Sequence, residues 1–465
     1  AEDANKYALI YNILVRIKPG TTTEIEPDLA ERWEVSEDGL VWTFYLRQGV
    51  KWHHGYGEFT ADDVVFTWDF LKTHENSLYR ENAAVVESVT AVDPYTVQFR
   101  LAAPYGPFIW RVANVLPFTG YVLSRAAMEE LGIEGYEQTP VGTGPFILKE
   151  MVSREYLLAE ANPDYYEGRP ALDAVKITVI TDSQTALAAL EAGDVHIVEL
   201  SDHLQASRFE GSDRLQVMAR PAYLLYWLNL NMTIPPFDDV RVRKAAQLAI
   251  DYQGLIDTAL GGYGTIPHQG LLQPGMVGFD ESVNPANQYD PEAARQLLQE
   301  AGYLDNPVPI TCVTYDHTLA VRLAEVVEQT MRQAGFNIDV QNLERGTFNE
   351  VRVADDTQCA ILFYSGESDP DFLVSLFYGP NRPPAMLNIS RYTGIDDLYE
   401  AQRQAASTEE RVELLRQVQA RITEDVPLVM ALMGNRIWVV SNQVQNFEPL
   451  VTFSGLLFQN VDLVN

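Results

Sequence analysis

The sequence predicts an α/β protein with two lobes and a smaller third domain. Three observations indicate this fold class: two β-α-β patterns lie far apart in the chain, the apolar crossing segment Ala222–Asp251 separates them, and about residues 27–140 carry hairpin and short-helix patterns. At 465 residues the chain is long enough for two or three domains with their own cores.

The amino-terminal part is predicted to contain a hairpin, a corner and a helix. Trp33–Val35 and Val41–Leu46 flank a turn-forming Glu-Asp-Gly run, so they are expected to pair as strands. Thr60 stands three residues before Asp63, which predicts a capping box. His53-His54 forms the corner between these elements. The chain has no H-x-x-x-H pair and no second Cys/His cluster, so this corner is predicted to be structural and not a metal site.

The first β-α-β pattern consists of the strands Val175–Ile180 and Val195–Leu200 with the helix Ser183–Ala192 between them. Asp182 is a suitable N-cap for that helix and Gly193 a suitable stop. These signals define an α/β lobe after the hairpin-rich region.

The second β-α-β pattern runs through Ile310–Tyr315, Leu319–Ala334 and Phe336–Leu343. A short helix near Phe348–Val353 and a strand at Cys359–Tyr364 follow it. Because a doubly wound sheet places its first strand beside its third, Cys312 and Cys359 are predicted to lie on neighbouring strands. The sequence leaves open whether the two cysteines are bonded.

The crossing segment begins as an apolar strand, passes Pro235-Pro236 and enters a helix capped by Asp238 or Asp239. The strands expected to act as hinges are Trp227–Met232 and a return strand near Met433–Val439.

Composition excludes several classes of protein. Hydrophobic residues make up 46% of the chain and aromatic residues 11%, which is typical of a globular protein. No apolar run approaches the roughly 20 residues of a membrane span. Its net charge of −32 argues against binding to nucleic acid. That acidity favours solubility, and it suits either a cationic or neutral solute or a generally acidic surface.

Catalytic motifs are weak. Asp369 and Asp371 could form a general acid/base pair, but acids beside a proline after a strand more often form turns. The segment Gly142–Phe146 lacks the lysine of a phosphate-binding loop, and no G-x-S-x-G, H-E-x-x-H or C-x-x-C occurs. A hydrolase is therefore only a remote alternative, and no cofactor or metal is expected.

Ligands of open α/β sheets bind beyond the carboxyl ends of the strands, where the strand order reverses. In the second lobe these ends lead into Tyr315-Asp316-His317 and Tyr364–Phe372. The latter loop combines an aromatic residue, a glycine and several acids. Two lobes joined by crossing strands would face each other across a cleft lined by this loop.

The ordered motifs of the chain resemble those of the extracellular solute-binding proteins of family 5, the receptors of ABC importers. They cover nearly the whole chain: PDLAERWEVSEDGLVWTFYLRQGVKWHHG, FTADDVVFTWDFL, PVGTGPF, ANPDYYEGRPALD, LNLNMTIPPFDDVRVRKAAQLAID, YDPEAARQLLQEAGY and SDPDF. The resemblance implies a periplasmic-binding-protein-like type II fold, without enzymatic activity, that closes by hinge motion around a solute. In the family the His corner is a packing signature.

The resemblance also implies a domain organisation, a partner and a location. Lobe I is expected to comprise residues 1–27, 139–230 and 437–465, the small α+β domain residues 28–138, and lobe II residues 231–436. The partners would be the solute and the transmembrane permease subunits of an ABC transporter, and the protein would be a monomer in the periplasm or outside the cell, with lipid anchoring at the cell surface as an option. The protein is expected to be exported, and a signal peptide is not expected within this chain.

Two departures from the family pattern matter. The corner carries a second histidine and is about one residue longer. The family also places a strand and an extended segment before the helix expected at Lys6–Leu14, so either the mature amino terminus is missing from this sequence or the first lobe lacks a strand.

The expected ligand-binding residues fall into three groups. Tyr364, Ser365, Glu367 and Asp369 belong to the loop after the last strand of lobe II. Gly142, Thr143 and Gly144 could let backbone approach a ligand, although a turn required by the fold is an equal alternative. Trp227 and Asn229 lie at the crossing and Trp110 in the small domain, where each aromatic side chain suits a core as well as a ligand platform.

The resemblance favours a short peptide as the ligand. Peptide receptors of the family hold the free amino terminus with an aspartate in the loop where this chain has SGESDPD, one residue shorter. Glu367 could replace that aspartate, since its longer side chain compensates for the shorter loop. If it does not, an oligosaccharide or another non-peptide solute becomes the better choice.

Overall fold

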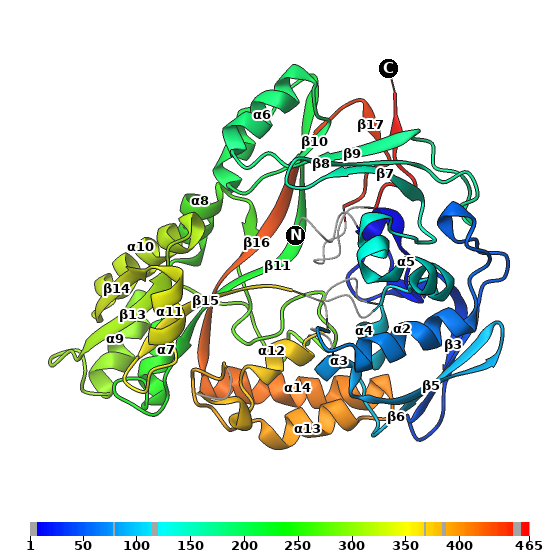
Figure 1. Ribbon diagram of the computed structural model, residues 1–465. Coiled ribbons are helices and arrows are strands. Elements are labelled where there is room, and N and C mark those ends of the chain that lie inside the picture. Colours follow the sequence, from blue (N-terminus) through cyan, green and yellow to red (C-terminus); the bar gives the residue numbers. More distant parts are fainter. Residues whose placement is uncertain are drawn as a thin grey trace.

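Two long antiparallel strands, β11 (Leu215–Leu230) and β16 (Leu428–Ser441), connect the halves of the molecule (Figure 1). The computed structural model describes residues 7–77, 80–113, 120–366, 369–383, 387–449 and 457–464. The two strands belong to a seven-stranded sheet in the order β10-β16-β11-β15-β13-β14, and β12 pairs with β16. The two lobes therefore share one continuous sheet, because both crossing strands are long enough to pair on either side of the crossing.

The small domain is built on a four-stranded antiparallel sheet in the order β3-β4-β6-β5. The predicted hairpin is confirmed as β3 (Ala30–Val35) and β4 (Val41–Leu46). The predicted capping box of α2 (Ala61–Thr73) is also present, with the backbone N–H of Thr60 donating to Asp63 Oδ2 at 3.0 Å. The other elements in this part of the chain are β1 (Val15–Ile17), β2 (Ile25–Pro27), α3 (Arg80–Ala83), β5 (Val86–Asp93), β6 (Thr96–Leu101), α4 (Phe108–Val112) and α5 (Arg125–Gln138).

The first β-α-β pattern forms its predicted elements, but its strands do not pair with each other. Helix α6 (Ser183–Ala192) is capped by Asp182 and ends at Gly193 in the left-handed conformation. Its flanking strands are β9 (Ala174–Thr178), in a sheet with β7 (Phe146–Val152) and β8 (Tyr156–Ala161), and β10 (Ile197–Glu199), at the edge of the large sheet. Residues of both β9 and β10 line a cavity of about 710 Å³.

The second β-α-β pattern is confirmed, with parallel strands in the order β14-β13-β15. Cys312 of β13 lies opposite Cys359 of β15, as predicted, and the two form a disulfide. The elements of this lobe are α7 (Val240–Leu248), α8 (Tyr252–Leu260), β12 (Gly264–Thr265), α9 (Pro291–Glu300), β13 (Pro309–Tyr315), α10 (Thr318–Gln333), β14 (Asn337–Leu343), α11 (Arg345–Val351), β15 (Cys359–Ser365), α12 (Asp371–Ser375), α13 (Asp396–Gln404) and α14 (Thr408–Asp425).

The crossing strands carry an irregularity where the lobes meet. The pairing register between β11 and β16 shifts between Pro221 and Leu224, opposite Asn435 and Gly434. A β-bulge of this kind bends a strand, and a second register shift lies between Tyr226 and Trp227. Beyond β11, Asp239, and not Asp238, caps α7 by accepting a hydrogen bond from the N–H of Arg241.

Two large cores lie on either side of the crossing. One packs α7, α8, α10 and the middle strands of the large sheet, and the other packs the small domain against β7 and β8. Among the described residues, none of the helices has the length and apolar character needed to span a membrane. A short pairing of β17 (Val444–Gln445) with β18 (Asp462–Leu463) completes the described chain.

Candidate ligand-binding site

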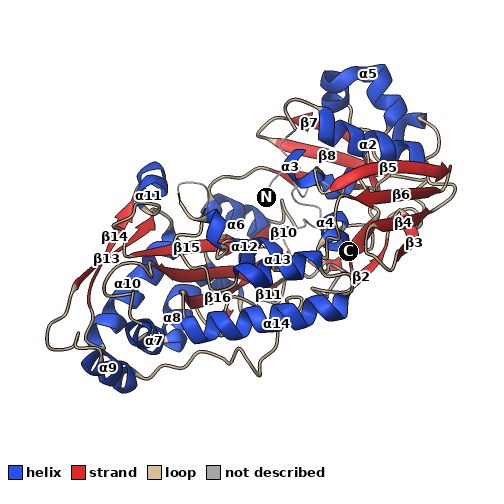
Figure 2. Ribbon diagram, turned by 90° about the horizontal axis from the view of Figure 1, so that it is seen from below, coloured by secondary structure: helices blue, strands red, loops and turns tan. Residues whose placement is uncertain are grey.

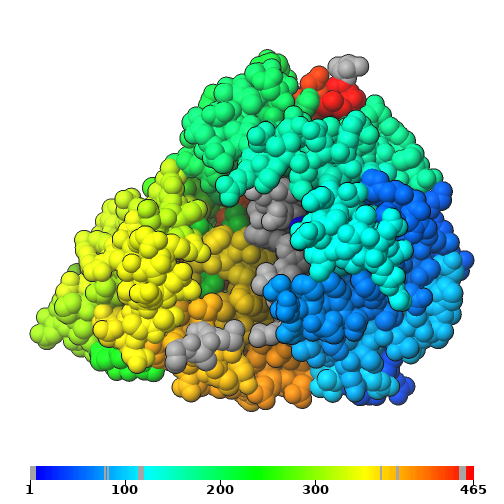
Figure 3. All heavy atoms as spheres, viewed as in Figure 1, coloured from blue at the N-terminus to red at the C-terminus, as the bar shows by residue number. Residues whose placement is uncertain are grey.

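The carboxyl ends of three parallel strands meet at one edge of lobe II. β13 ends at Tyr315, β14 at Leu343 and β15 at Ser365, and the N–H of Asp316 donates to the carbonyl of Leu343 at 2.9 Å. This is the edge at which open α/β sheets bind ligands. In the space-filling view the yellow surface of this lobe borders a hollow that faces the blue and cyan part of the molecule (Figure 3).

Aromatic side chains and Arg345 lie at this edge, and Arg352 follows at the other end of α11. We call Tyr226, Tyr315, His317, Arg345, Phe348, Arg352 and Phe363 the α11 wall. Tyr226 and Phe363 have ring centroids 4.7 Å apart, and the Tyr315 ring lies 5.4 Å from that of Phe348. The guanidinium carbon of Arg345 lies 4.5 Å from the centre of the Tyr315 ring, and that of Arg352 lies 5.4 Å from the centre of the Phe348 ring.

The two arginines of the α11 wall lack an acidic partner among the described residues. Elsewhere arginines pair with acids, as in Arg322–Asp202 at 2.8 Å and Arg436–Glu199 at 2.7 Å. The Nε of Arg352 is buried without a hydrogen-bond partner, and burial together with the charge of Arg345 lowers its pKa. In a chain of net charge −32, Arg345, an exposed cation without an acidic partner among the described residues, is suited to an anionic group of a ligand.

The sequence reasoning missed both arginines. The usable signal was the position of Arg345, which begins the helix directly after a strand that ends at this edge. In a strongly acidic chain, a cation at such a position is a better candidate for a ligand-binding residue than most of the abundant acids.

Of the ligand-binding residues predicted in the loop after β15, some lie at the strand end and one is buried in an ion pair. Tyr364 and Ser365 end β15 half-buried, and the Tyr364 ring stacks on the exposed ring of Phe372 at 5.7 Å. Glu367 lies outside the described residues. Asp369 is buried and binds both terminal nitrogens of Arg411.

The Gly142-Thr143-Gly144 turn packs against the amino-terminal segment. A Cβ on Gly142 would lie 1.8 Å from the carbonyl oxygen of Ile10, and one on Gly144 would lie 2.6 Å from the same oxygen. The hydroxyl of Thr143 donates to Asn12 at 3.1 Å. These contacts explain the glycines without a ligand.

The His corner packs onto the same turn. The backbone N–H of His53 donates to the carbonyl of Gly142 at 2.9 Å, and its Nε2 lies 3.0 Å from the carbonyl oxygen of Gly144. Burial lowers the pKa of His53 to about 4, so the ring is neutral and donates from Nε2. His54 is exposed in a left-handed conformation. Within the described part of the chain no group of three or more His, Cys, Asp and Glu is placed to hold a metal ion.

The predicted aromatic platforms lie in or against cores. Trp227 and Asn229 of β11 are 1% and 0% exposed, and neither the indole N–H nor the Asn229 amide has a hydrogen-bond partner among the described residues. Trp110 of α4 is half-buried and packs against the core of lobe II. The structure thus brings Tyr364 and Ser365 to the ligand edge but places Trp227 and Asn229 inside the sheet.

The small domain contacts lobe II through a polar cluster beside the loop after β15. The hydroxyl of Tyr105 donates to Asp371 Oδ2 at 2.9 Å, and the N–H of Gly106 donates to the carbonyl of Arg403 at 2.7 Å. Seen from below, α13 and α14 extend from lobe II toward the strands of the small domain (Figure 2). The loop that carries the predicted ligand residues is therefore anchored at the junction of two domains.

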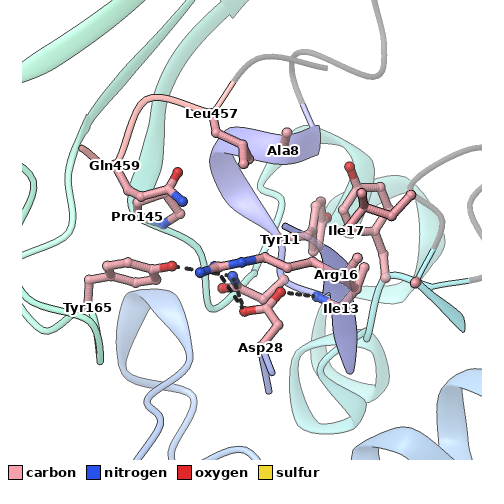
Figure 4. A pocket seen from close by; sticks show the side chains of 13 residues that line it. Ala8, Tyr11, Ile13, Arg16, Ile17, Asp28, Pro145, Tyr165, Leu457 and Gln459 are labelled. Atoms are coloured by element: carbon pink, nitrogen blue, oxygen red, sulfur yellow. Dashed lines mark hydrogen bonds and ion pairs between the residues drawn. The ribbon is translucent and has the colours of Figure 1, made fainter. Parts of the chain in front are cut away.

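A second polar group lines a cavity of about 40 Å³ near the amino terminus. Asp28 accepts hydrogen bonds from Asn12 at 3.0 Å and from the N–H of Ile13 at 3.1 Å, and Arg16 lies 3.7 Å away (Figure 4). Burial raises the pKa of Asp28 even with Arg16 beside it. This network ties the amino-terminal segment to the Gly142–Gly144 turn.

Two lobes that share one sheet, with a hollow between them and an exposed arginine without an acidic partner at a strand end, define a binding protein of the two-lobed type. The chain belongs to the bacterial extracellular solute-binding proteins, family 5, whose model matches residues 24–384.

Two relatives of the chain are named as binding proteins. The chain is 28% identical to the dipeptide-binding protein of Escherichia coli over 95% of this chain and 87% of the relative. It is 29% identical to the glutathione-binding protein GsiB of Salmonella paratyphi A, over 94% and 85% of the two chains. The solved structure of HbpA2 from Haemophilus parasuis superimposes with a TM-score of 0.88 at 28% identity, covering 99% of this chain and 95% of that one.

Family membership settles the class of function. The fold is the type II periplasmic-binding-protein fold, and the chain is a solute-binding receptor of the ABC-importer class, not an enzyme. Such receptors work in the periplasm or outside the cell and have permease partners.

Proposed function

We propose that this receptor binds short peptides between its lobes and delivers them to an ABC permease by hinge closure. The observation that carries the proposal is Arg345, an exposed guanidinium that lies over the ring of Tyr315 at the carboxyl end of β13 and has no acidic partner among the described residues. A peptide's terminal carboxylate is the anion that such a group binds best, through charge-assisted hydrogen bonds. The names of the relatives, a dipeptide-binding and a glutathione-binding protein, support the same ligand class.

The opposite end of the peptide needs an anionic partner. We propose Glu367 for the ligand's ammonium group, because its loop follows Ser365 at the end of β15 and is fixed beyond it by Asp369 and Arg411. Tyr364 and Ser365 would line the site beside it. A buried ammonium without a paired acid is costly, so this position would decide whether charged amino termini are accepted.

Closure is proposed to bend the shared sheet at the register shift between Pro221 and Leu224, opposite Gly434. The moving bodies would be lobe I (residues 1–27, 139–230 and 437–465) with the small domain (residues 28–138), and lobe II (residues 231–436). A ligand stabilises the closed form only through contacts with both bodies. A monomer is the proposed working unit, and lipid anchoring at the cell surface is compatible with that role.

Calorimetric titration with di- and tripeptides tests the ligand class. We expect binding of free peptides, loss of affinity on N-acetylation or C-amidation, and a weakening of about 2–5 kcal/mol in both Glu367→Gln and Arg345→Gln. Glu292→Gln, on the exposed surface of α9, is the matched control and should change nothing. Binding confined to uncharged oligosaccharides would overturn the peptide assignment.

Small-angle scattering tests the closure mechanism separately. A saturating peptide should reduce the radius of gyration of the wild-type protein. Identical scattering curves with and without a bound peptide would rule out hinge closure as the response to that ligand.

A further inference from the structure

Two phenylalanine rings are exposed on either side of the loop after β15. Phe363 is 40% exposed and Phe372, in the short helix that follows the loop, is 41% exposed. No other phenylalanine or tryptophan among the described residues reaches this exposure. An exposed phenylalanine forgoes the favourable transfer of its ring out of water. Because both rings border the loop proposed to bind the ligand, a bound ligand is the partner that would cover them.

Phe363 lies just past the end of the neighbouring strand. Val313 of β13 pairs with Ala360 of β15. Two residues further along this parallel register, Tyr315 at the end of β13 lies level with Leu362. Phe363 is the next residue of β15, and it is also the first exposed one, since the four residues before it are buried. Its ring is therefore uncovered at the carboxyl ends of the strands, where open α/β sheets bind ligands.

A row of rings joins Phe363 to Arg345. The ring centroids of Phe363 and Tyr226 are 4.7 Å apart, and the side chain of Tyr226 hydrogen-bonds that of Tyr315. The guanidinium carbon of Arg345 lies 4.5 Å from the centre of the Tyr315 ring. Tyr226 and Tyr315 are 1% and 6% exposed. The two tyrosines thus form the buried floor of the row, and Phe363 and Arg345 are its exposed ends.

Phe372 belongs to a different surface. Its ring stacks on that of Tyr364 at 5.7 Å. Side chains of successive strand residues point to opposite faces of a sheet, so Tyr364 and Phe363 lie on opposite faces of β15. Of the two exposed phenylalanines, Phe363 is therefore the one that shares a face with Tyr226 and the row that leads to Arg345.

We propose that Phe363 is a specificity-determining residue, which selects peptides whose carboxyl-terminal residue has a large apolar or aromatic side chain. That side chain packs on the Phe363 ring while the terminal carboxylate binds Arg345. The inference rests on the proposed peptide-binding function and adds the class of side chain. One residue can meet both ends of the row, because its carboxylate and its side chain leave the same Cα. A small polar side chain would leave the Phe363 ring in water and bind more weakly.

Peptide pairs that differ in one side chain test this inference. Dissociation constants are measured by calorimetry for Ala-Phe and Ala-Ser, for Ala-Ala-Phe and Ala-Ala-Ser, and for the reversed tripeptides Phe-Ala-Ala and Ser-Ala-Ala. The wild-type protein should bind peptides that end in phenylalanine about tenfold or more tightly than those that end in serine. The reversed pair should differ less. The preference should persist at physiological salt, because salt screens charges and not apolar contacts.

Three variants locate the preference. Phe363→Thr removes the ring but keeps a side chain suited to a strand, and it should bring the ratio of the two dissociation constants to within about threefold of one. Phe363→Tyr keeps the ring and should keep the ratio. Tyr289→Thr is the matched control, because Tyr289 is an exposed aromatic residue that precedes α9, and it should change neither dissociation constant.

The possible results separate the inference from the function on which it rests. Equal affinity for peptides that end in phenylalanine and in serine would overturn the inference while the peptide receptor stands. A preference that survives Phe363→Thr, or that is as large for the reversed pair, would overturn the role of Phe363 at the carboxyl-terminal residue. Absence of binding to any di- or tripeptide would overturn the proposed function together with the inference.

Discussion

Arg411 binds Asp369 through two parallel hydrogen bonds, one of them 2.8 Å long, and both side chains are buried, at 2% and 5% exposure. The remaining Nε of Arg411 donates to Gln402 at 3.0 Å, and Gln402 in turn donates to Asp371 at 2.9 Å. Both aspartates of the Ser-Asp-Pro-Asp-Phe motif are therefore used in fixing the loop after β15, which explains their presence without acid/base chemistry.

Breaking this pair should be costly. Arg411→Met leaves the Asp369 carboxylate buried without its partner, and we expect a loss of about 3–5 kcal/mol in unfolding free energy by urea denaturation of the ligand-free protein. Arg416→Met is the matched control, because Arg416 pairs with Glu413 on the exposed face of α14 and should cost less than about 1 kcal/mol. Equal effects of the two substitutions would contradict the structural role of the buried pair.

The Gly142 turn should be sensitive to a single methyl group. Gly142→Ala places a Cβ 1.8 Å from the carbonyl oxygen of Ile10, so backbone must move, and we expect a loss of about 3 kcal/mol or more without any ligand present. Thermal unfolding followed by circular dichroism measures it. Thr143→Ser keeps the hydroxyl that bonds Asn12 and should be nearly neutral. A normal melting temperature for Gly142→Ala combined with weakened ligand binding would instead place this turn in the ligand site.

Stability should depend on pH through His53. Its pKa is about 4 in the folded protein, below its usual value of about 6.5, so the unfolded chain takes up the proton first. The contribution of His53 to the free energy of unfolding does not change above pH 6.5. As the pH falls from 6.5 toward 4, this contribution lowers the free energy of unfolding by about 3 kcal/mol in total.

Urea denaturation between pH 7.5 and pH 4 checks this contribution. His53→Gln keeps a donor near the carbonyl of Gly144 without the titrating ring, so its unfolding free energy should fall less steeply than that of the wild type. The exposed His54→Gln variant should follow the wild type. Parallel curves for His53→Gln and wild type would disprove the assignment.

The disulfide should stabilise lobe II. Cys312 and Cys359 are 47 residues apart in sequence, and closing a loop of that length removes unfolded-state entropy worth about 4 kcal/mol. Reductant should therefore lower the melting temperature of the wild-type protein but not that of the Cys312→Ala/Cys359→Ala double variant. A wild-type melting curve insensitive to complete reduction, verified by thiol titration, would show that the bond contributes little.

The sequence by itself determined the local elements and their order. Asp182 and Gly193 delimit α6 because a helix cap depends only on residues within a turn of the helix end. The same holds for Thr60 and Asp63 at α2. The neighbouring positions of Cys312 and Cys359 also followed from sequence, since a doubly wound sheet has few possible strand orders.

Only the tertiary structure decided which side chains meet. Tyr105 bonds Asp371 across 266 residues, and β9 and β10 stay apart although the helix between them formed as predicted. The burial of Trp227 decided between the core and the ligand platform that the sequence had left open, and the fold placed Arg345 beside Tyr315 at the strand ends without an acidic partner among the described residues. The physical reason is the sequence separation of the interacting residues. Helix capping and periodicity depend on residues a few positions apart, whereas burial and charge pairing depend on which distant segments the folded chain places in contact.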